Sequence, residues 1–207
     1  MKLITISGVD GSGKSTQIKL LQNHLASLGK KIFYFHAIEF GLAKKMTDFR
    51  NKYCLICKLL GKCKVNSAPK SVTKANWLQI QMRKIFLRID LWRFESLYHE
   101  LEKKGFDFIL SDRYFYDSII NLQYLMKKNV DFSSEESIMR PDLAIYLEIV
   151  PEEIMQRDRK PDQGIEYLQK KIELFSEKKA LWKMQTISAN RLKEEIFSEI
   201  IEKIILI

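Results

Sequence analysis

The fold of this chain is decided by Gly8-Val9-Asp10-Gly11-Ser12-Gly13-Lys14-Ser15-Thr16, which fits the pattern G-x-x-x-x-G-K-[ST] at every constrained position. The apolar, β-branched run 2–7 before it predicts a buried strand. Apolar residues at helical spacing over 17–28 predict a helix after it. In this context backbone N–H groups of the loop converge on phosphate oxygens beside a helix N-terminus. The stretch therefore predicts a nucleotide-binding site.

Each residue type in this loop has a physical reason. Its three glycines allow backbone angles and close approaches that a Cβ would forbid. Lys14 supplies a point charge for the β- and γ-phosphates, and Ser15 offers a hydroxyl to Mg²⁺. A glycine turn with a chance Lys-Ser pair is the ordinary alternative, which the flanking strand and helix argue against. The predicted nucleotide-binding residues are Gly8, Asp10, Gly11, Ser12, Gly13, Lys14, Ser15 and Thr16, and Lys14 is also predicted to be catalytic.

The composition is that of a globular protein with an excess of basic residues. The chain has 207 residues, 46% hydrophobic and 29% charged, and a formal net charge of +9. This length suits one α/β domain, so we expect 1–207 to form a single domain. No apolar run reaches transmembrane length, and the early strand leaves no room for a signal peptide, so we expect a cytoplasmic protein without membrane contact. Lysines are scattered over several helices, which favours an anionic small substrate over nucleic acid.

Three cysteines, Cys54, Cys57 and Cys63, fall within ten residues of one another. Their spacing raises the hypothesis of a zinc site, but a structural zinc usually takes four ligands and the sequence supplies three thiols there. The alternative is that they are small apolar residues beside leucine and isoleucine neighbours. We favour the second interpretation.

Strand-like and helix-like stretches alternate along the rest of the chain. Such alternation predicts a parallel sheet with helices on both faces. Predicted strands cover 2–7, 31–36, 106–111, 143–147 and 182–187; predicted helices cover 17–28, 77–104 (one helix or two), 115–128, 165–179 and 190–204, with a short helix opening at Pro151.

Charged residues stand where predicted strands and helices end. Asp112 and Arg113 follow the third strand at its carboxyl end, where open parallel sheets bind ligands. Asp112, together with Ser15, is a candidate to hold Mg²⁺ and to act in catalysis. Arg113 can grip a phosphate with two parallel hydrogen bonds. Arg157 and Arg159 lie on a loop that could close and neutralise charge during phosphoryl transfer, although a solvated basic turn is the more common meaning of such a run.

Taken together, these motifs resemble those of the thymidylate kinase family. The glycine loop matches the family's loop, including the carboxylate of Asp10 two residues after the first glycine. Three further segments are similar: Asp112-Arg113-Tyr114 with Ser118 and Gln123 downstream, the strand and helix start over 141–153, and the arginine loop from Arg157. The resemblance spans nearly the whole chain and is weakest over 37–90.

The resemblance implies a fold, a reaction and cofactors. The fold would be α/β, of the three-layer P-loop nucleoside-monophosphate-kinase type, with a five-stranded parallel sheet. ATP with Mg²⁺ would donate a phosphoryl group to dTMP and so yield dTDP. The stretch around 39–75 would be an acceptor-side flap, and 157–164 would be the lid. The family commonly forms homodimers, so we expect a homodimer.

The resemblance also assigns roles to single residues. Asp10 would face the acceptor sugar, Arg113 would hold the acceptor phosphate and Gln123 would sit near the base. Gly11 stands where one branch of the family has arginine, and the glycine branch takes its catalytic arginine from the lid. The resemblance implies that Arg159 is this catalytic arginine, with Arg157 as the second choice. On the acceptor side it implies that Tyr114 lies beside Arg113, that Arg88 or Arg93 contacts the acceptor phosphate and that Phe86 contacts the thymine ring. Asn190 and Arg191 would lie near the adenine.

The sequence departs from the family on the acceptor side. After the second strand the usual Phe-Pro-x-Arg-like stretch is missing, and Leu122 stands where the family often has an aromatic residue. A kinase of another nucleotide, or of a nucleoside, is therefore the first alternative. A nucleotide-dependent switch or regulatory ATPase is the second, but the arginines of the acceptor and lid segments exceed what a hydrolase requires.

Overall fold

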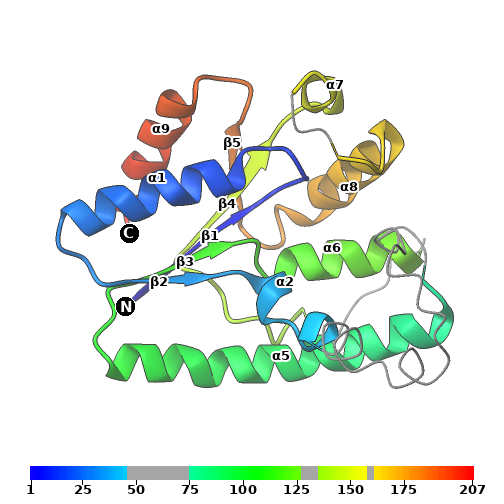
Figure 1. The fold of residues 1–207 in the computed structure, drawn as a ribbon, viewed down its shortest axis with the longest axis horizontal. Helices are drawn as coiled ribbons and strands as arrows, with labels where there is room; N and C mark the ends of the chain where they lie inside the picture. Colours follow the sequence, from blue (N-terminus) through cyan, green and yellow to red (C-terminus); the bar gives the residue numbers. More distant parts are fainter. Residues whose placement is uncertain (46–74, 127–134, 158–160) are drawn as a thin grey trace, which may run out of the picture.

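The computed structural model describes residues 1–45, 75–126, 135–157 and 161–207 (Figure 1). In chain order the elements are β1 (Lys2–Ser7), α1 (Lys14–Ser27), β2 (Ile32–Phe35), α2 (Ala37–Phe40), α5 (Trp77–Lys103), β3 (Phe108–Asp112), α6 (Phe115–Met126), β4 (Leu143–Glu148), α7 (Pro151–Met155), α8 (Ile165–Lys178), β5 (Gln185–Ser188) and α9 (Lys193–Ile205). The three cysteines, Arg159 and most of the expected flap lie outside the described residues, so the predictions about them stay predictions.

The five strands form one parallel sheet in the order β2-β3-β1-β4-β5, which confirms the predicted sheet. The central strand β1 pairs with β3 on one side and β4 on the other, and its side chains are buried from Leu3 to Ser7. After β1 the chain crosses to β2 on one side, whereas after β3 it crosses to β4 on the other. The carboxyl ends of β1 and β3 therefore open into the crevice where such sheets bind ligands.

Helices cover both faces of the sheet. Helices α1 and α9 pack together on one face, while α5, α6 and α8 form a row on the other (Figure 1). The apolar spacing of each helix explains its placement: Ile18, Leu21 and Leu25 face inward from α1, and Ile196 and Ile200 face inward from α9. The three layers bury the central strands on both sides, as parallel sheets require.

An aromatic cluster fixes α5 and α6 against the sheet. The Phe35 ring lies 4.6 Å from that of Phe94, which in turn lies 5.3 Å from Phe115 and 5.6 Å from Tyr114. All four residues are at most 2% exposed. This packing holds the start of α6, and the turn before it, in a defined place under the carboxyl ends of the strands.

Three elements begin three residues away from their predicted starts: α1 begins at Lys14, β5 at Gln185 and α9 at Lys193. The fifth strand begins at Gln185 rather than at residue 182. Trp182 instead stacks on Tyr116 with ring centroids 4.5 Å apart, and Lys183 has a left-handed φ of 51°, so the chain turns before it enters the sheet. The sequence left open whether 77–104 forms one helix or two, and the structure has one helix, from Trp77 to Lys103. Among the described residues, no helix combines the length and the apolar character needed to cross a membrane.

Candidate active site

The glycine loop between β1 and α1 closes tightly against β4. Gly8 has a φ of 151°, and a Cβ there would lie 2.9 Å from the carbonyl oxygen of Leu147, so only glycine fits. Gly13 is left-handed with a φ of 95° and directly precedes Lys14, the first residue of α1. This geometry places the loop's backbone around the N-terminus of α1, which is how a phosphate cradle is built.

Lys14 is folded back onto its own loop. Its Nζ donates a hydrogen bond of 2.7 Å to the carbonyl oxygen of Val9 and one of 3.4 Å to the hydroxyl of Ser12. The side chain is 4% exposed, and burial lowers the pKa of Lys14 to about 8, with a further lowering from the charge of Arg113. A buried ammonium so placed would gain strongly from an arriving phosphate.

Two oxygen groups near the cradle are suited to a hard cation. Ser15, on the first turn of α1, is exposed. Asp112, the last residue of β3, is 3% exposed, and its Oδ1 has no hydrogen-bond partner in the described structure. Its carboxylate and burial raise the pKa of nearby Tyr34 to about 12, burial being the larger cause. A buried carboxylate oxygen left without a partner fits a site for Mg²⁺ or for its bound water.

On the other side of the loop, Asp10 and Arg113 form an ion pair. The guanidinium donates from Nη2 to Oδ1 of Asp10, and Tyr167 of α8 donates its hydroxyl to Oδ2 at 3.4 Å. Burial by itself would raise the pKa of Asp10, but the charges of Arg113 and Lys171 outweigh it and lower the pKa to about 2. Asp10 is thus a carboxylate at neutral pH within the glycine loop itself.

Backbone geometry puts Arg113 at this place. It follows the last residue of β3, has a left-handed φ of 64°, and its N–H donates to the carbonyl oxygen of Ile6 at the end of β1. Asp117, in the first turn of α6, then accepts hydrogen bonds from the Ser7 hydroxyl at 2.6 Å and the Tyr114 N–H at 3.0 Å. Asp117 therefore ties the start of the glycine loop to the turn that carries Arg113.

Two buried charged residues of the site escaped the sequence analysis. Asp117 stands in the first turn of a helix, where an acidic residue is a familiar capping signal. Lys171 lies one turn after Tyr167 on the buried face of α8 and is 3% exposed. The sequence did contain a signal for Lys171, since this lysine interrupts the apolar stripe between Leu168 and Phe175. Long charged side chains are rarely buried without a role, so such a lysine is a candidate site residue.

Arg157 reaches across the cradle from the end of α7. Its Nη1 donates a hydrogen bond of 2.5 Å to the carbonyl oxygen of Gly11, and its Nη2 donates one of 3.1 Å to the carbonyl oxygen of Ala189. It thereby links the glycine loop with the loop between β5 and α9. Of the two predicted lid arginines, Arg157 is the one that the described residues contain, and it lies against the phosphate cradle.

Comparisons with known proteins identify several relatives of this chain. No family model matches the chain. A thymidylate kinase from Prochlorococcus marinus is 33% identical over 205 residues, which cover 91% of this chain and 89% of the relative. The chain belongs to the thymidylate kinase family. A thymidylate kinase from Dictyostelium discoideum is 28% identical over 206 residues, or 95% of this chain and 82% of the relative.

Solved thymidylate kinase structures confirm the predicted P-loop kinase fold. The structure from Candida albicans aligns with a TM-score of 0.60 at 20% identity over 98% of this chain and 90% of its own. The structure from Ehrlichia chaffeensis aligns with a TM-score of 0.58 at 15% identity over 98% of each chain. As a member of the thymidylate kinase family, the chain is an enzyme of the nucleoside monophosphate kinase class.

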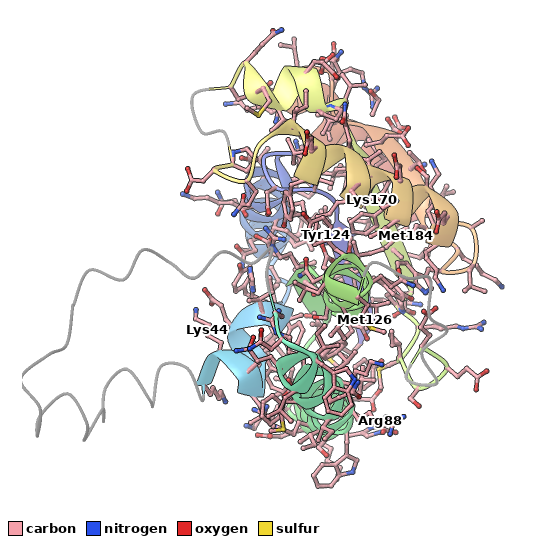
Figure 2. All side chains as sticks on the ribbon, turned by 90° about the vertical axis from the view of Figure 1, so that its right-hand side faces the viewer. Lys44, Arg88, Tyr124, Met126, Lys170 and Met184 are labelled. Atoms are coloured by element: carbon pink, nitrogen blue, oxygen red, sulfur yellow. The ribbon has the colours of Figure 1, made fainter. Side chains whose placement is uncertain are left out.

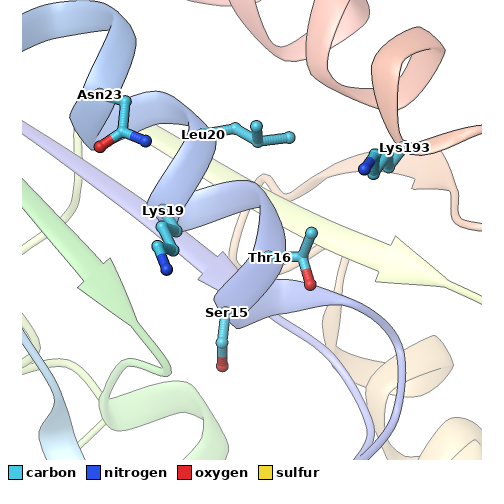
Figure 3. Close-up of a pocket in the computed structure, with 6 residues that line it drawn as sticks. All are labelled: Ser15, Thr16, Lys19, Leu20, Asn23 and Lys193. Atoms are coloured by element: carbon cyan, nitrogen blue, oxygen red, sulfur yellow. The ribbon is translucent and has the colours of Figure 1, made fainter.

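The residues that the family resemblance placed near the adenine lie between β5 and α9. Asn190 donates to Oε1 of Glu153 on α7, and Arg191 donates to Oε2 of Glu199 on α9. Ala189, directly before them, accepts from Arg157, so this loop borders the phosphate cradle. A pocket lies between the first turns of α1 and Lys193, the first residue of α9 (Figure 3). Its lining residues are Ser15, Thr16, Lys19, Leu20, Asn23 and Lys193.

Two predicted acceptor residues, Tyr114 in the turn before α6 and Gln123 of α6, are fully enclosed. Gln123 is 2% exposed, and neither atom of its amide has a hydrogen-bond partner within the described structure. Tyr114 lies in the aromatic cluster, and its hydroxyl donates 2.8 Å to the carbonyl oxygen of Met139. The structure therefore does not bring the Tyr114 side chain to Arg113; its contribution to the site is the backbone N–H that Asp117 accepts.

The candidates on α5 separate into different environments. Arg88 lies on the exposed outer side of the helix, away from Tyr124 of α6 (Figure 2). Arg93 donates 2.5 Å to Asp90 and 3.3 Å to the carbonyl oxygen of Phe40, so it holds α2 against α5. Phe86 is half-buried. The sequence analysis missed Arg83, which is half-buried in the inward stripe of α5, and burial lowers its pKa.

Proposed function

We propose that this kinase transfers the γ-phosphoryl group of ATP to dTMP and releases dTDP and ADP. The observation that carries the proposal is the Asp10–Arg113 pair, because Asp10 belongs to the phosphate loop itself. A guanidinium is thus anchored directly beside the place where the γ-phosphate would end. An acceptor phosphate held there would face the donor in line, as phosphoryl transfer requires.

The donor side supports ATP with Mg²⁺. The loop's N–H groups would cradle the β- and γ-phosphates, and Lys14 would leave the carbonyl oxygen of Val9 to meet them. Ser15 and Asp112 would hold Mg²⁺, Asp112 directly or through water, since its Oδ1 is buried without a partner. When bound, the metal would neutralise charge on the β- and γ-phosphates.

The acceptor side supports a nucleoside monophosphate. Arg113 would grip the 5′-phosphate with its planar fork, and Asp10 would accept a hydrogen bond from the sugar. Gln123 carries a buried amide that lacks partners, and an amide can donate and accept side by side along the edge of a pyrimidine. Arg83, half-buried on α5, is a better placed second group for the phosphate than the exposed Arg88.

For the transition state, we propose guanidinium groups from the lid. Arg157 already contacts the carbonyl oxygen of Gly11 in the cradle, which supports its role. Arg159, the first choice from the sequence, stays a prediction because it lies outside the described residues. Either group would stabilise charge that develops on the migrating phosphoryl group.

We also propose that the enzyme is a homodimer. Along the exposed side of α5, apolar residues recur with alternating spacings of four and three, which is the pattern of helices that pack side by side. This α5 stripe consists of Leu78, Met82, Ile85, Ile89 and Trp92, which are 38–69% exposed. A large exposed apolar patch of this kind is typical of a protein interface. The expected cytoplasmic location and the absence of a nucleic-acid partner stay predictions.

A coupled assay of ADP release over a panel of nucleoside monophosphates and nucleosides tests the proposal. ADP should form only when an acceptor is added, and dTMP should give the highest kcat/KM. A different best acceptor would replace dTMP in the proposal. ADP formation at the same rate without any acceptor would instead support the regulatory ATPase and overturn a kinase.

A further inference from the structure

Substrate binding poses an electrostatic problem at Asp10. In the free enzyme its carboxylate, 28% exposed, is satisfied mainly by Arg113. In the proposed reaction Arg113 turns its fork to the acceptor phosphate, a dianion that competes with Asp10 for the same guanidinium. A partly buried carboxylate that loses its counter-charge is destabilised and tends to take up a proton. A protonated Asp10 would then lose much of its strength as an acceptor for the sugar hydroxyl.

Lys171 is a second cation near Asp10 that could replace Arg113 when the acceptor phosphate binds. It is 3% exposed on the inner face of α8, one turn after Tyr167, whose hydroxyl already donates to Asp10. Its ammonium lies 4.9 Å from the centre of the Tyr167 ring. Among the residues that the structure describes, no oxygen accepts a hydrogen bond from this ammonium. Lys171 is therefore a buried charge with unused donors, beside the one carboxylate that stands to lose a partner.

The charges that face Lys171 come from three elements. Asp10 of the glycine loop and Asp117 of α6 favour its charged form, whereas Arg113, at the turn before α6, disfavours it. Burial is the largest influence, and the pKa of Lys171 is lowered to about 8. Lys171 in turn is among the charges that lower the pKa of Asp10. When an incoming phosphate neutralises Arg113, the repulsion on Lys171 falls and its attraction to Asp10 is left unopposed.

We propose that Lys171 is a positioning residue, which takes over the carboxylate of Asp10 when the acceptor phosphate draws Arg113 away. Asp10 then stays ionised and aimed at the sugar hydroxyl of the bound nucleotide. The inference rests on the proposed function, since it assumes an acceptor that carries both a 5′-phosphate and a 3′-hydroxyl.

A merely structural lysine would behave differently. If the ammonium served only the fold, Lys171→Met would change the melting temperature in one direction or the other and leave substrate preferences unchanged. An aliphatic side chain of similar length would also fill the space beside Tyr167 without the cost of a buried charge. The decisive readout is therefore how the enzyme distinguishes an acceptor with the sugar hydroxyl from one without it.

The experiment measures kcat and KM for dTMP, for 3′-deoxythymidine monophosphate and for ATP. It compares the wild type with Lys171→Met, Lys171→Arg, Asp10→Asn and the double variant of Asp10→Asn with Lys171→Met. Lys170→Met is the matched control, because Lys170 is the preceding residue on α8, is exposed and pairs with Glu173 at 2.8 Å.

Lys171→Met is expected to raise the KM for dTMP about tenfold and to change the KM for ATP less than twofold. The preference for dTMP over the 3′-deoxy analogue should fall to threefold or less. Lys171→Arg, which keeps the charge, should retain most of that preference, and Lys170→Met should retain all of it. In the Asp10→Asn background, Lys171→Met should raise the KM for dTMP by less than a further twofold, because the carboxylate that Lys171 serves is gone.

The inference is overturned if the effects of Asp10→Asn and Lys171→Met on the KM for dTMP multiply in the double variant as those of independent sites would. It is also overturned if Lys171→Met leaves the preference for dTMP over the 3′-deoxy analogue unchanged. If Lys171→Met does not fold, Lys171→Gln replaces it with the same expected results. The wild-type arm separates the two proposals: failure to phosphorylate dTMP counts against the proposed acceptor. The same variants are then compared with the monophosphate that the panel identifies and its 3′-deoxy form.

Discussion

The two sides of the candidate active site are built by different means. The donor side is one continuous stretch, 8–16, whose main chain forms the cradle and whose glycines are required by its angles. The acceptor side is a group of side chains from the glycine loop, the turn after β3 and α8, among them Asp10, Arg113 and Tyr167. Backbone geometry thus determines the first site, whereas compensating charges determine the second.

This difference affects how each side should respond to change. On the donor side, Lys14 is the charged side chain expected to meet the phosphates, and most of the remaining contacts are backbone N–H groups that substitution cannot remove. On the acceptor side Asp10 and Arg113 are partners of one another, so a substitution of either residue also releases the other. Four experiments test this contrast, beginning with the largest expected effect.

Removal of the donor lysine should have the largest effect. Lys14→Ala is expected to lower kcat at least about a hundredfold with every acceptor, because the buried ammonium would meet charge on the β- and γ-phosphates. Steady-state kinetics with dTMP and one poorer acceptor measures the effect. The control is Lys19→Ala, an exposed lysine farther along α1. A loss that depended on the acceptor would contradict a donor role for Lys14.

Removal of the acceptor arginine should act on one substrate alone. Arg113→Ala is expected to raise the KM for dTMP at least about tenfold, since the loss of a bidentate charged contact costs about 1.5–3 kcal/mol. Binding of ATP, followed by calorimetry, should change little. Arg113→Lys keeps the charge but lacks the fork, so it should recover only part of the loss. Equal losses for ATP and dTMP would show that the two sides are not separate.

The lid arginines should affect the chemical step more than binding. Arg157→Ala is expected to lower kcat about tenfold with a smaller change in either KM, because the charge that it meets develops in the transition state. Arg159→Ala is predicted to behave in the same way. Single-turnover measurements separate the chemical step from product release. A raised KM for ATP with an unchanged kcat would instead make Arg157 a structural link between Gly11 and Ala189.

The pH dependence of donor use should reveal the buried Lys14. Its pKa of about 8 in the free enzyme means that the charged form is lost as the pH rises through 8. We therefore expect kcat/KM for ATP, measured at a dTMP concentration well below its KM, to fall about tenfold between pH 7 and pH 9. Lys14→Arg, which cannot lose its proton in this range, should be slower but nearly independent of pH. If kcat/KM for ATP fell by the same amount in Lys14→Arg, the pH dependence would belong to another group, such as Lys171.

Much of the fold follows from patterns that the sequence states locally. Alternating apolar strands and amphipathic helices led to a parallel sheet, and four of the five strands were placed within two residues of their observed starts. The beginning of β5 was placed three residues too early. Trp182 resembles a strand residue in its local pattern, but it stacks on Tyr116 of α6, which is distant in sequence. Tertiary contacts of this kind override local propensity.

The sequence by itself was enough to predict the donor site, because a cradle made of backbone needs only its glycines, its lysine and the strand and helix on either side. It also identified Asp10 and Arg113 separately. Only the tertiary structure showed that these two form a pair, that Asp117 locks the turn and that Lys171 is buried beside them. The physical reason is that charge compensation depends on distance and burial across segments more than 100 residues apart, and no local pattern encodes either quantity.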